Sequence, residues 1–427
     1  GGIIGNTAGS SIKSIDNVTF SNNKTNATYT NQLVKGGVIG NFGTIESITN
    51  TKFTGNTSSP YYGSTFGGAI FNADTGVINK ISKSEFIGNK SGSGGAIYND
   101  GTITLIEEAT FKDNSSGTIF NADTGKIDKI SKTEFTGNSS VSNRTSAIYN
   151  NGTITSIDEV TFKNNGSGAI LNNGTITLIN EATINNNNYT YNGTILNNGT
   201  ITTISNSEIG NNSSPAIYNT GHIGTIDNTN IHDNTGEGSI LNRGTIDLIS
   251  NSKITGSTSS GIKSIKADGE NDTPHIGRIE NTEISNNRDY GINAFASDID
   301  ELDGVTIKDN NIGIYLFGNG ESHKIGSIKN SLFENNDYGA LYLSHDSSLG
   351  DVSDSKFISN HSSNGGAIAV YNRGYNGISA SVGNFTNVLF ENNEGRGGAI
   401  YFDSGDSAPL LVGKFKDVTF KNNKSSD

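Results

Sequence analysis

One short sequence unit recurs from one end of this chain to the other and limits the fold more than any other feature. Residues 94–114 show it most completely, as Gly-Gly-Ala-Ile-Tyr-Asn-Asp-Gly-Thr-Ile-Thr-Leu-Ile-Glu-Glu-Ala-Thr-Phe-Lys-Asp-Asn. Its short apolar segments are separated by Asn, Asp, Gly and Glu residues. Short β-branched or aromatic segments between turn residues are typical of β-strands. No stretch sustains the 3.6-residue period of a helix, so we expect almost no helix.

The residue that closes each unit gives the clearest repeat. A Phe or Ile stands there, at sixteen positions that lie 22 to 33 residues apart. Asn follows three residues later in fifteen of them, and only Ile254 departs, with Ser257. The sixteen positions are Phe20, Phe53, Phe86, Phe111, Phe135, Phe162, Ile184, Ile209, Ile231, Ile254, Ile284, Ile307, Phe333, Phe357, Phe390 and Phe420.

Two further segments precede that residue in each unit. Gly-Gly-Ala-Ile, or a looser form of it, comes first, as at residues 67–70 and 94–97, and Gly-Thr-Ile-x-x-Ile follows, as at 101–106 and 152–157. A unit this short has no room for a crossover helix. We therefore expect each strand to pair with its equivalent one turn later. The sequence therefore predicts an all-β, parallel β-helix of about 16 three-strand turns over residues 1–427. The crossover rule favours a right-handed coil.

Stacking of such turns predicts two structural ladders. Equivalent aromatic rings would form a column in the core, and Asn side chains at matched corners would form amide ladders. The predicted ladder residues are Phe86, Phe111, Phe135, Phe162, Asn99, Asn121, Asn150 and Asn172.

Irregular loop insertions are expected at two places in the repeat. Those after the F-x-x-N segment carry candidate binding residues Tyr61, Tyr62, Tyr189 and Tyr191, and each set is expected at one edge of the coil. The expected insertions are residues 24–35, 57–66, 139–146 and 188–193, and, after the Gly-Ala-Ile strand, 266–275, 317–324 and 372–384.

Composition excludes several classes of partner and site. The formal net charge of −13 argues against nucleic acid and anionic membrane surfaces as partners. The absence of Cys excludes disulfides and thiolate metal sites. No apolar run approaches the length of a membrane helix, so we do not expect the chain to be membrane-inserted. Because it begins with Gly1 and has no signal peptide, we expect a processed product or a fragment.

The sequence predicts no catalytic site. Galacturonan hydrolases with this fold carry Asn-Thr-Asp, Asp-Asp, His-Gly and Arg-Ile-Lys, whereas this chain has only Asn228-Thr229-Asn230 and Arg278-Ile279-Glu280. Gly405-Asp406-Ser407 has the form of a hydrolase nucleophile segment, but Ala408-Pro409 follows it, which favours a polar turn. A carboxylate pair in another arrangement is the alternative left open.

Metal and cofactor sites are not expected either. The six His residues lie in different units without ligand spacing, so we expect them to face solvent. Asp-rich segments at 72–76, 121–125 and 268–272 offer oxygen ligands that suit Ca²⁺, but they lack the nonapeptide calcium repeat. Turn chemistry explains these segments better.

Two sets of strand residues are candidate binding sites. The residue after each Ile anchor either faces outward as an apolar stripe or tucks into a core corner, and the sequence leaves both open. The second set is a ladder of Thr side chains that could hydrogen-bond to a like surface. The candidates are Tyr98, Tyr149 and Tyr218 in the stripe, with Phe71, Phe120, Leu171, Leu196 and Leu241, and Thr102, Thr104, Thr153, Thr155, Thr175 and Thr177 in the ladder.

The pairing of Gly-Gly-Ala-Ile with F-x-x-N over nearly the whole chain resembles the repeat of the polymorphic outer-membrane protein family of autotransporters. The Thr-, Asn- and Ser-rich turns are also similar to self-associating autotransporter adhesins of the AIDA type. The middle units, residues 184–310, depart from the pattern because Ile replaces Phe and the double Gly is lost.

The resemblance implies a right-handed β-helical passenger of a Gram-negative autotransporter. Such a passenger would be extracellular, anchored through an outer-membrane barrel absent from this fragment, or secreted. It implies a non-enzymatic adhesin that binds a host-cell protein or glycan, or its own copies. The competing hypothesis is a polysaccharide-binding or polysaccharide-cleaving β-helix, and a third is a spacer whose binding domain lies elsewhere.

Overall fold

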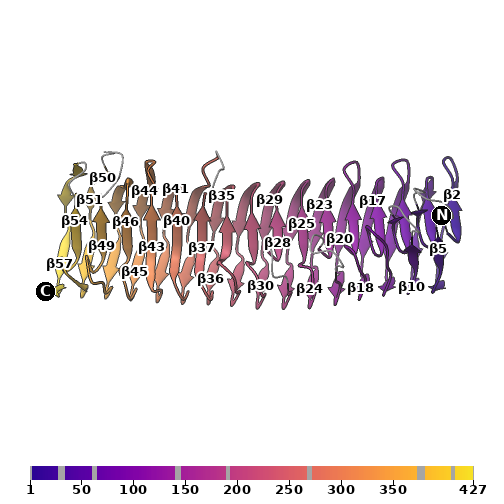
Figure 1. Cartoon of the computed structure of the whole chain (residues 1–427), viewed down its shortest axis with the longest axis horizontal. Helices are drawn as coiled ribbons and strands as arrows, with labels where there is room; N and C mark the ends of the chain where they lie inside the picture. The colour runs from indigo at the N-terminus through magenta and orange to yellow at the C-terminus, as the bar shows by residue number, and fades with distance from the viewer. Residues whose placement is uncertain are drawn as a thin grey trace. The chain divides into compact units, whose positions relative to one another are not determined.

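The structure, a computed structural model, consists of parallel β-strands (Figure 1). It describes residues 2–26, 34–59, 65–139, 146–188, 193–266, 272–372, 380–404 and 409–426. Contacts divide the chain into two compact units, Gly1–Ser214 and Pro215–Asp427. In each unit three parallel sheets coil around a core, and the described residues contain no helix, hence none that could cross a membrane. The prediction of an all-β, right-handed parallel β-helix is confirmed.

Sheet 1 of the first unit contains the Ile-x-Asn strands that follow the Gly-Ala segments. They are β1 (Ile4–Asn6), β7 (Ile39–Asn41), β13 (Ile70–Asn72), β16 (Ile97–Asn99), β19 (Ile119–Asn121), β22 (Ile148–Asn150), β25 (Ile170–Asn172) and β28 (Ile195–Asn197). Sheet 2 contains the Thr-Ile-x-x-Ile strands. They are β2 (Ser11–Ile12), β3 (Ile15–Asp16), β8 (Thr44–Ile45), β9 (Ile48–Thr49), β14 (Val77–Ser82), β17 (Thr102–Glu107), β20 (Lys126–Ser131), β23 (Thr153–Asp158), β26 (Thr175–Asn180) and β29 (Thr200–Ser205).

Sheet 3 of the first unit contains the strands centred on the closing Phe or Ile. They are β4 (Thr19–Ser21), β10 (Lys52–Thr54), β15 (Glu85–Ile87), β18 (Thr110–Lys112), β21 (Glu134–Thr136), β24 (Thr161–Lys163), β27 (Thr183–Asn185) and β30 (Glu208–Gly210). Two insertions expected to be irregular, 24–35 and 57–66, are partly regular, because short strands within them pair with each other. These pairs are β5 (Lys24–Asn26) with β11 (Thr57–Ser59), and β6 (Val34–Lys35) with β12 (Thr65–Phe66).

The second unit repeats the three sheets. Sheet 1 contains β31 (Ile217–Asn219), β34 (Gly238–Asn242), β37 (Ser260–Ile265), β40 (Tyr290–Phe295), β43 (Ile312–Phe317), β46 (Leu341–Ser344), β49 (Ile368–Tyr371) and β54 (Ile400–Asp403). Sheet 2 contains β32 (His222–Asp227), β35 (Thr245–Ser250), β38 (His275–Glu280), β41 (Asp298–Asp303), β44 (His323–Lys329), β47 (Ser347–Ser353), β50 (Ala380–Val382), β51 (Phe385–Thr386), β55 (Leu410–Val412) and β56 (Phe415–Lys416).

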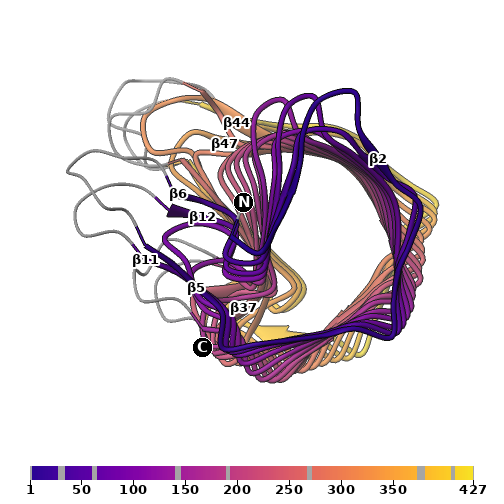
Figure 2. The same ribbon diagram turned by 90° about the vertical axis from the view of Figure 1, so that its right-hand side faces the viewer.

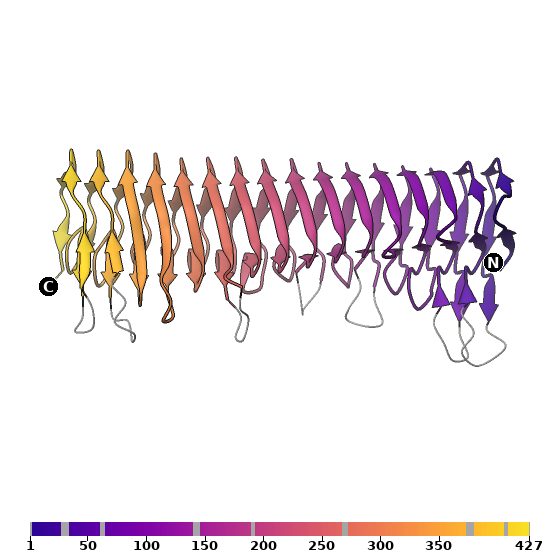
Figure 3. The ribbon, with the colours of Figure 1, turned by 90° about the horizontal axis from the view of Figure 1, so that it is seen from above.

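Sheet 3 completes the second unit, whose strands lie side by side at the orange and yellow end of Figure 3. They are β33 (Asn230–His232), β36 (Lys253–Thr255), β39 (Glu283–Ser285), β42 (Thr306–Lys308), β45 (Leu332–Glu334), β48 (Lys356–Ile358), β52 (Leu389–Glu391) and β57 (Thr419–Lys421), and β53 (Glu394–Gly395) also pairs with β58 (Lys424–Ser425). Counted over the described residues, sheets 1 and 3 have eight strands in each unit, in agreement with about sixteen predicted turns.

Equivalent residues stack in register, as the repeat predicts. Ile97 pairs with Ile70 on one side and Ile119 on the other. Phe111 lies between Phe86 and Phe135, with ring centroids 4.7 and 4.8 Å away. All of these side chains are buried, so the core is built from columns of like residues.

A kink in sheet 2 explains how Ile residues three positions apart both reach the core. Regular alternation would turn Ile103 and Ile106 to opposite faces, yet both are fully buried. The register pairs Ile103 and Leu105 with the preceding strand but skips Thr104, which is exposed. The strand therefore bends at Thr104, and this break brings the second Ile inward.

Two corners of each turn require a left-handed backbone. In the unit at 94–114, Glu108 precedes sheet 3 with φ 49° and Asp113 follows it with φ 54°. Asn or Gly stands at the equivalent position in many other turns, because these residues adopt positive φ at least cost. The end-on view of Figure 2 shows the flat sheets of the first unit meeting at such corners.

Buried Asn side chains connect the turns at two corners. The Asn99 amide donates to Asn121 Oδ1 at 2.7 Å and to the Gly101 carbonyl at 3.0 Å, and Asn121 donates to Asn150 Oδ1 at 2.8 Å. Asn150 continues the ladder to Asn172, again at 2.8 Å. The Asn residues of the F-x-x-N segments form a second ladder, as between Asn138 and Asn165 at 2.9 Å. These amides satisfy turn groups that the sheets leave unpaired.

Candidate functional site

The Thr side chains of sheet 2 form a polar outer surface of the first unit. Thr104, Thr153, Thr155, Thr175 and Thr177 are exposed, whereas Thr102 and Thr200 are half-buried. We call the stretch on β23, β26 and β29 the threonine face: Thr153, Thr155, Thr175, Thr177, Thr200 and Thr202. Thr153 pairs in register with Thr175, and Thr175 with Thr200.

Charged residues interrupt this ladder before β23. Lys126 of β20 stands between Thr102 and Thr153 in the register, and its ammonium lies 2.8 Å from Asp128. At the other edge of the same sheet, Lys129 lies 2.8 Å from Asp158. Hydrogen bonds from Asn180 and Lys129 lower the pKa of Asp158. The charges beside the threonine face are thus paired within the chain.

The stripe that follows the Ile anchors is partly buried. In the first unit we call Phe71, Tyr98, Phe120 and Tyr149 the aromatic row. Phe71 is 2% exposed and the other three are half-buried. Leu171 and Leu196 continue the row and are buried, as is Leu241 of the second unit, whereas Tyr218 is half-buried. The residues of the stripe therefore differ: some are partly exposed on the outer surface, and others are buried against their neighbours.

Most rings in the aromatic row cover one another's faces. Tyr98 stacks on Phe71 at 5.5 Å and on Phe120 at 5.1 Å, with interplanar angles of 14° and 3°. Phe120 meets Tyr149 edge-on at 4.7 Å. Phe66 adds an edge-on contact to Tyr98 at 4.6 Å. The exposed parts of Tyr98 and Phe120 are consequently ring edges and the Tyr98 hydroxyl.

Carboxylates line the hollow beside these rings. The hollow has a volume of about 480 Å³, and we call it the acidic aromatic groove; its lining is Asp74, Tyr98, Asp100, Phe120, Ala122, Asp123, Thr124 and Asn151. Burial, together with the negative charges of Asp100 and Asp123, raises the pKa of Tyr98 to about 12. The Tyr98 phenol therefore stays neutral at physiological pH and lies in a negative potential.

Cations of the chain itself pack on this stripe elsewhere. The Lys35 ammonium lies 5.0 Å from the ring centroid of Phe71, whose other neighbour in the register is Gly40. In the second unit, Arg243 lies 5.6 Å from the Tyr218 ring and Arg396 lies 5.3 Å from the Tyr401 ring. A cation over an aromatic face is a favourable contact.

The second unit carries a separate row of tyrosines on sheet 1, which we call the tyrosine row: Tyr290, Tyr315, Tyr342, Tyr371 and Tyr401. All five are half-buried. Successive ring centroids lie 5.4 to 5.5 Å apart with interplanar angles of 28° to 45°. Burial raises the pKa of Tyr315 to about 12, with Tyr290 and Tyr342 contributing. The rings are more tilted than those of Tyr98 and Phe120.

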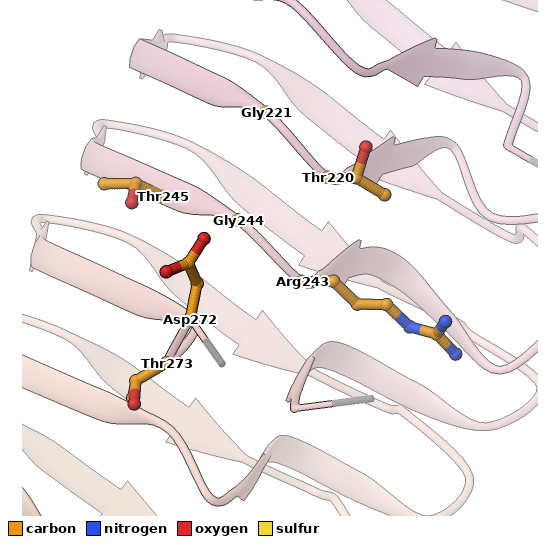
Figure 4. A pocket seen from close by; sticks show the side chains of 7 residues that line it. All are labelled: Thr220, Gly221, Arg243, Gly244, Thr245, Asp272 and Thr273. Atoms are coloured by element: carbon orange, nitrogen blue, oxygen red, sulfur yellow. The ribbon is translucent and has the colours of Figure 1, made fainter. Parts of the chain in front are cut away.

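A larger hollow of about 650 Å³ also lies in the second unit (Figure 4). Its lining residues are Thr220, Gly221, Arg243, Gly244, Thr245, Asp272 and Thr273. The Arg243 side chain extends away from the Asp272 carboxylate. These described residues therefore bring together no pair of carboxylates for acid–base chemistry.

One known protein family matches part of this chain. A family model for right-handed β-helix regions matches residues 248–426. The matched family is defined by its coil, so the match supports the fold and its handedness but carries no activity. A search among curated proteins finds no match to this chain.

One histidine contradicts the expectation that all of them face solvent. His323 is 3% exposed, because it begins β44 in a corner, with its ring nitrogens 3.4 Å from Asp298 and 3.7 Å from Glu321. Burial by itself would raise the pKa of Asp298, but the nearby His323 ring, the Lys324 amide, which donates to Asp298 at 2.9 Å, and His275 together lower that pKa. Within the described parts of the chain, no three His, Asp or Glu residues lie close enough to hold a metal.

Several candidate residues lie outside the described residues. They are Tyr61, Tyr62, Tyr189 and Tyr191 of the insertions, the Gly405-Asp406-Ser407 segment, and residues 268–271 of one Asp-rich segment. Asp74 and Asp123 of the other two Asp-rich segments lie in turns and line the acidic aromatic groove. Their place in turns was predicted from the sequence, but their place in the groove was not. Their signal is an Asp one or two residues after the ladder Asn in successive turns, as at Asp100.

Proposed function

We propose that this chain is the extracellular passenger of a Gram-negative autotransporter adhesin, and that it binds host cells or its own copies through its outer surfaces without catalysis. The repeat resemblance supports this proposal, and the β-helix family match supports the fold that it requires. The single observation that carries it is the threonine face, where exposed hydroxyls recur in register on successive strands.

A repeated polar surface favours association by many weak contacts. Each hydroxyl that bonds across an interface contributes little, because the same group bonds to water in the free protein. Once one contact forms, however, the neighbouring contacts become intramolecular and their effect accumulates. A regular row on a rigid sheet can meet a second regular row without ordering flexible segments. The threonine face fits this mode of binding.

Sedimentation velocity of the full chain over a wide range of concentration and salt tests the self-binding arm. We expect dimers to grow with concentration. The variant T155K/T177K places charge on two neighbouring exposed positions and should abolish dimers through like-charge repulsion. The control T161K/T183K adds the same charge to a register pair in sheet 3 and should leave dimerisation intact.

Attachment of beads coated with the full chain tests the proposal as a whole. Clumping of the beads indicates self-binding, and attachment to host cells or immobilised glycans indicates the host arm. Beads that neither clump nor attach, carrying a protein with the far-UV spectrum of a folded β-helix, would contradict the proposed function and support the spacer hypothesis.

Polysaccharide binding is the second candidate, and the tyrosine row favours it. Tilted rings at regular intervals leave part of each aromatic face for contact with apolar sugar faces, while hydroxyls bond at the rim. Incubation with polysaccharides separates the two forms of this hypothesis. Retention on an insoluble glycan without new reducing ends indicates binding alone, whereas loss of viscosity with new reducing ends indicates cleavage.

A further inference from the structure

We propose that the acidic aromatic groove binds the lysine or arginine side chains of a basic segment in a partner protein. This inference names a partner class for the proposed adhesin and rests on that proposal for its biological setting.

The groove offers ring edges, and not ring faces, to a ligand. The faces of Tyr98 are covered by Phe71 and Phe120, so a sugar ring could not stack on them. What remains is an apolar wall of ring edges. Lysine and arginine pack their methylene stems along such walls while their charged ends stay at the rim. The wall therefore fits a long cationic side chain better than a flat sugar.

Three carboxylates give the rim of the groove a negative charge. Asp74, Asp100 and Asp123 come from successive turns and face one hollow. Asp100 accepts a hydrogen bond from the Thr124 hydroxyl, and Asp74 accepts one from the Thr75 amide at 2.9 Å. Over the ranges that the structure describes, none of the three carboxylates forms an ion pair with a lysine or arginine. Their summed negative potential favours a cationic occupant.

Cations of the chain itself pack on other parts of the same stripe. The stripe to which the groove belongs already holds Lys35 against Phe71, and Arg396 against Tyr401 in the second unit. Among the described lysines and arginines, none lies over Tyr98 or Phe120, where the carboxylates are gathered instead. The groove thus offers a partner's cation the same kind of aromatic wall that Lys35 and Arg396 use elsewhere. Its carboxylates add charge complementarity.

A labelled hexa-arginine peptide is the probe, measured by fluorescence anisotropy against the full chain. Hexa-glutamate with the same label is the charge control. The variant D100N/D123N keeps side-chain shape and the Thr124 hydrogen bond, and we expect it to weaken hexa-arginine binding about tenfold. The matched variant E108Q/E134Q removes the same charge at exposed positions away from the groove and should change Kd little.

The ring wall needs a separate variant. We expect Tyr98→Leu to preserve the fold, because Leu occupies the equivalent position at Leu171 and Leu196 in the same stripe. It shortens the wall, so we expect a several-fold weaker Kd for hexa-arginine. If hexa-arginine bound only through the overall negative charge of the chain, Tyr98→Leu would have the same Kd as the original chain.

Three results would overturn the inference: no binding of hexa-arginine, equal weakening by D100N/D123N and E108Q/E134Q, or equal binding of hexa-glutamate. These outcomes are distinguishable from failure of the proposed function. If beads coated with D100N/D123N still attach to cells, the adhesin proposal stands and the groove is not the site. If beads with the original chain do not attach while hexa-arginine still binds to the groove, the adhesin proposal fails and the groove remains a site for cationic side chains.

Discussion

At the scale of single residues, the fold depends on positions where the backbone or a polar group has one acceptable solution. Each corner before sheet 3 needs a left-handed residue, and in the first unit the corner after sheet 1 carries an amide that donates to one turn and accepts from another. Asn meets both needs, since it tolerates positive φ and carries a donor and an acceptor. The high Asn content is therefore a structural requirement of the turns.

Glu159 is a non-optimal residue at such a corner, with φ 53°. Asn occupies the equivalent position at Asn206 and Asn251, at φ 51° and 49°. Since left-handed backbone costs roughly 1–2 kcal/mol for most residues and less for Asn, we expect Glu159→Asn to raise the free energy of unfolding by about 0.5 kcal/mol. Urea unfolding measures the change. Glu134→Asn, in strand β21, is the control and should give no gain.

Asn150 in the buried ladder should be far less tolerant. Its amide donates to Asn172 Oδ1 and to the Gly152 carbonyl, and its own Oδ1 accepts from Asn121. Asn150→Ala leaves these buried groups without partners, which should cost about 3 kcal/mol. Asn173→Ala removes an exposed amide and should cost less than about 0.5 kcal/mol in the same urea titration. Similar losses for both variants would contradict the ladder's role.

At the scale of the elements, each strand is too short to be stable alone and depends on its equivalents in adjacent turns. Columns of like residues supply that stability, as in the sheet 3 column of Phe86, Phe111, Phe135 and Phe162. The column changes from Phe to Ile where Phe162 pairs with Ile184. The core at that junction therefore already accommodates both side chains.

This junction predicts a position-dependent cost of substitution. Phe111→Ala opens a cavity between two rings and should cost about 3–5 kcal/mol. Phe162→Ile extends a column that is already Ile on one side, so we expect a loss of about 1–2 kcal/mol. Thermal unfolding followed by circular dichroism compares the two. Equal losses would show that ring stacking beyond simple burial sets the cost.

The repeat made the strands and ladders predictable, because stacking converts sequence spacing directly into contact. Ile97 has an equivalent in nearly every unit, and Asn99 has an equivalent Asn in every turn of the first unit, so their neighbours could be named from the sequence. Residues outside the repeat could not be placed in that way. Lys35 reaches Phe71 from an insertion, and His323 is buried by a turn unlike the others. The acidic aromatic groove depends on which ring faces are covered, and that follows from packing angles that spacing does not encode.

At the scale of the whole molecule, charge dominates the response to solution conditions. The chain carries a net charge of −13, while the ion pairs along its sheets lie mostly on exposed side chains. Such pairs add little stability singly and are screened by salt. The carboxylates that matter most are those whose pKa the folded state changes, because they couple folding to pH.

The pKa of Asp158 determines in which direction the stability of the fold changes with pH. Hydrogen bonds from Asn180 and Lys129 lower its pKa in the folded state below the ordinary value of 3.8. The ionised form therefore stabilises the fold above about pH 4, and this contribution is lost as the pH falls through the lowered pKa. We expect Asp158→Asn to be less stable than the original chain at neutral pH, and the difference to shrink towards pH 2. Urea unfolding across that pH range measures it, with Asp74→Asn as an exposed control. A difference that stays constant with pH would mean that the substitution acts through packing and not through the charge of Asp158.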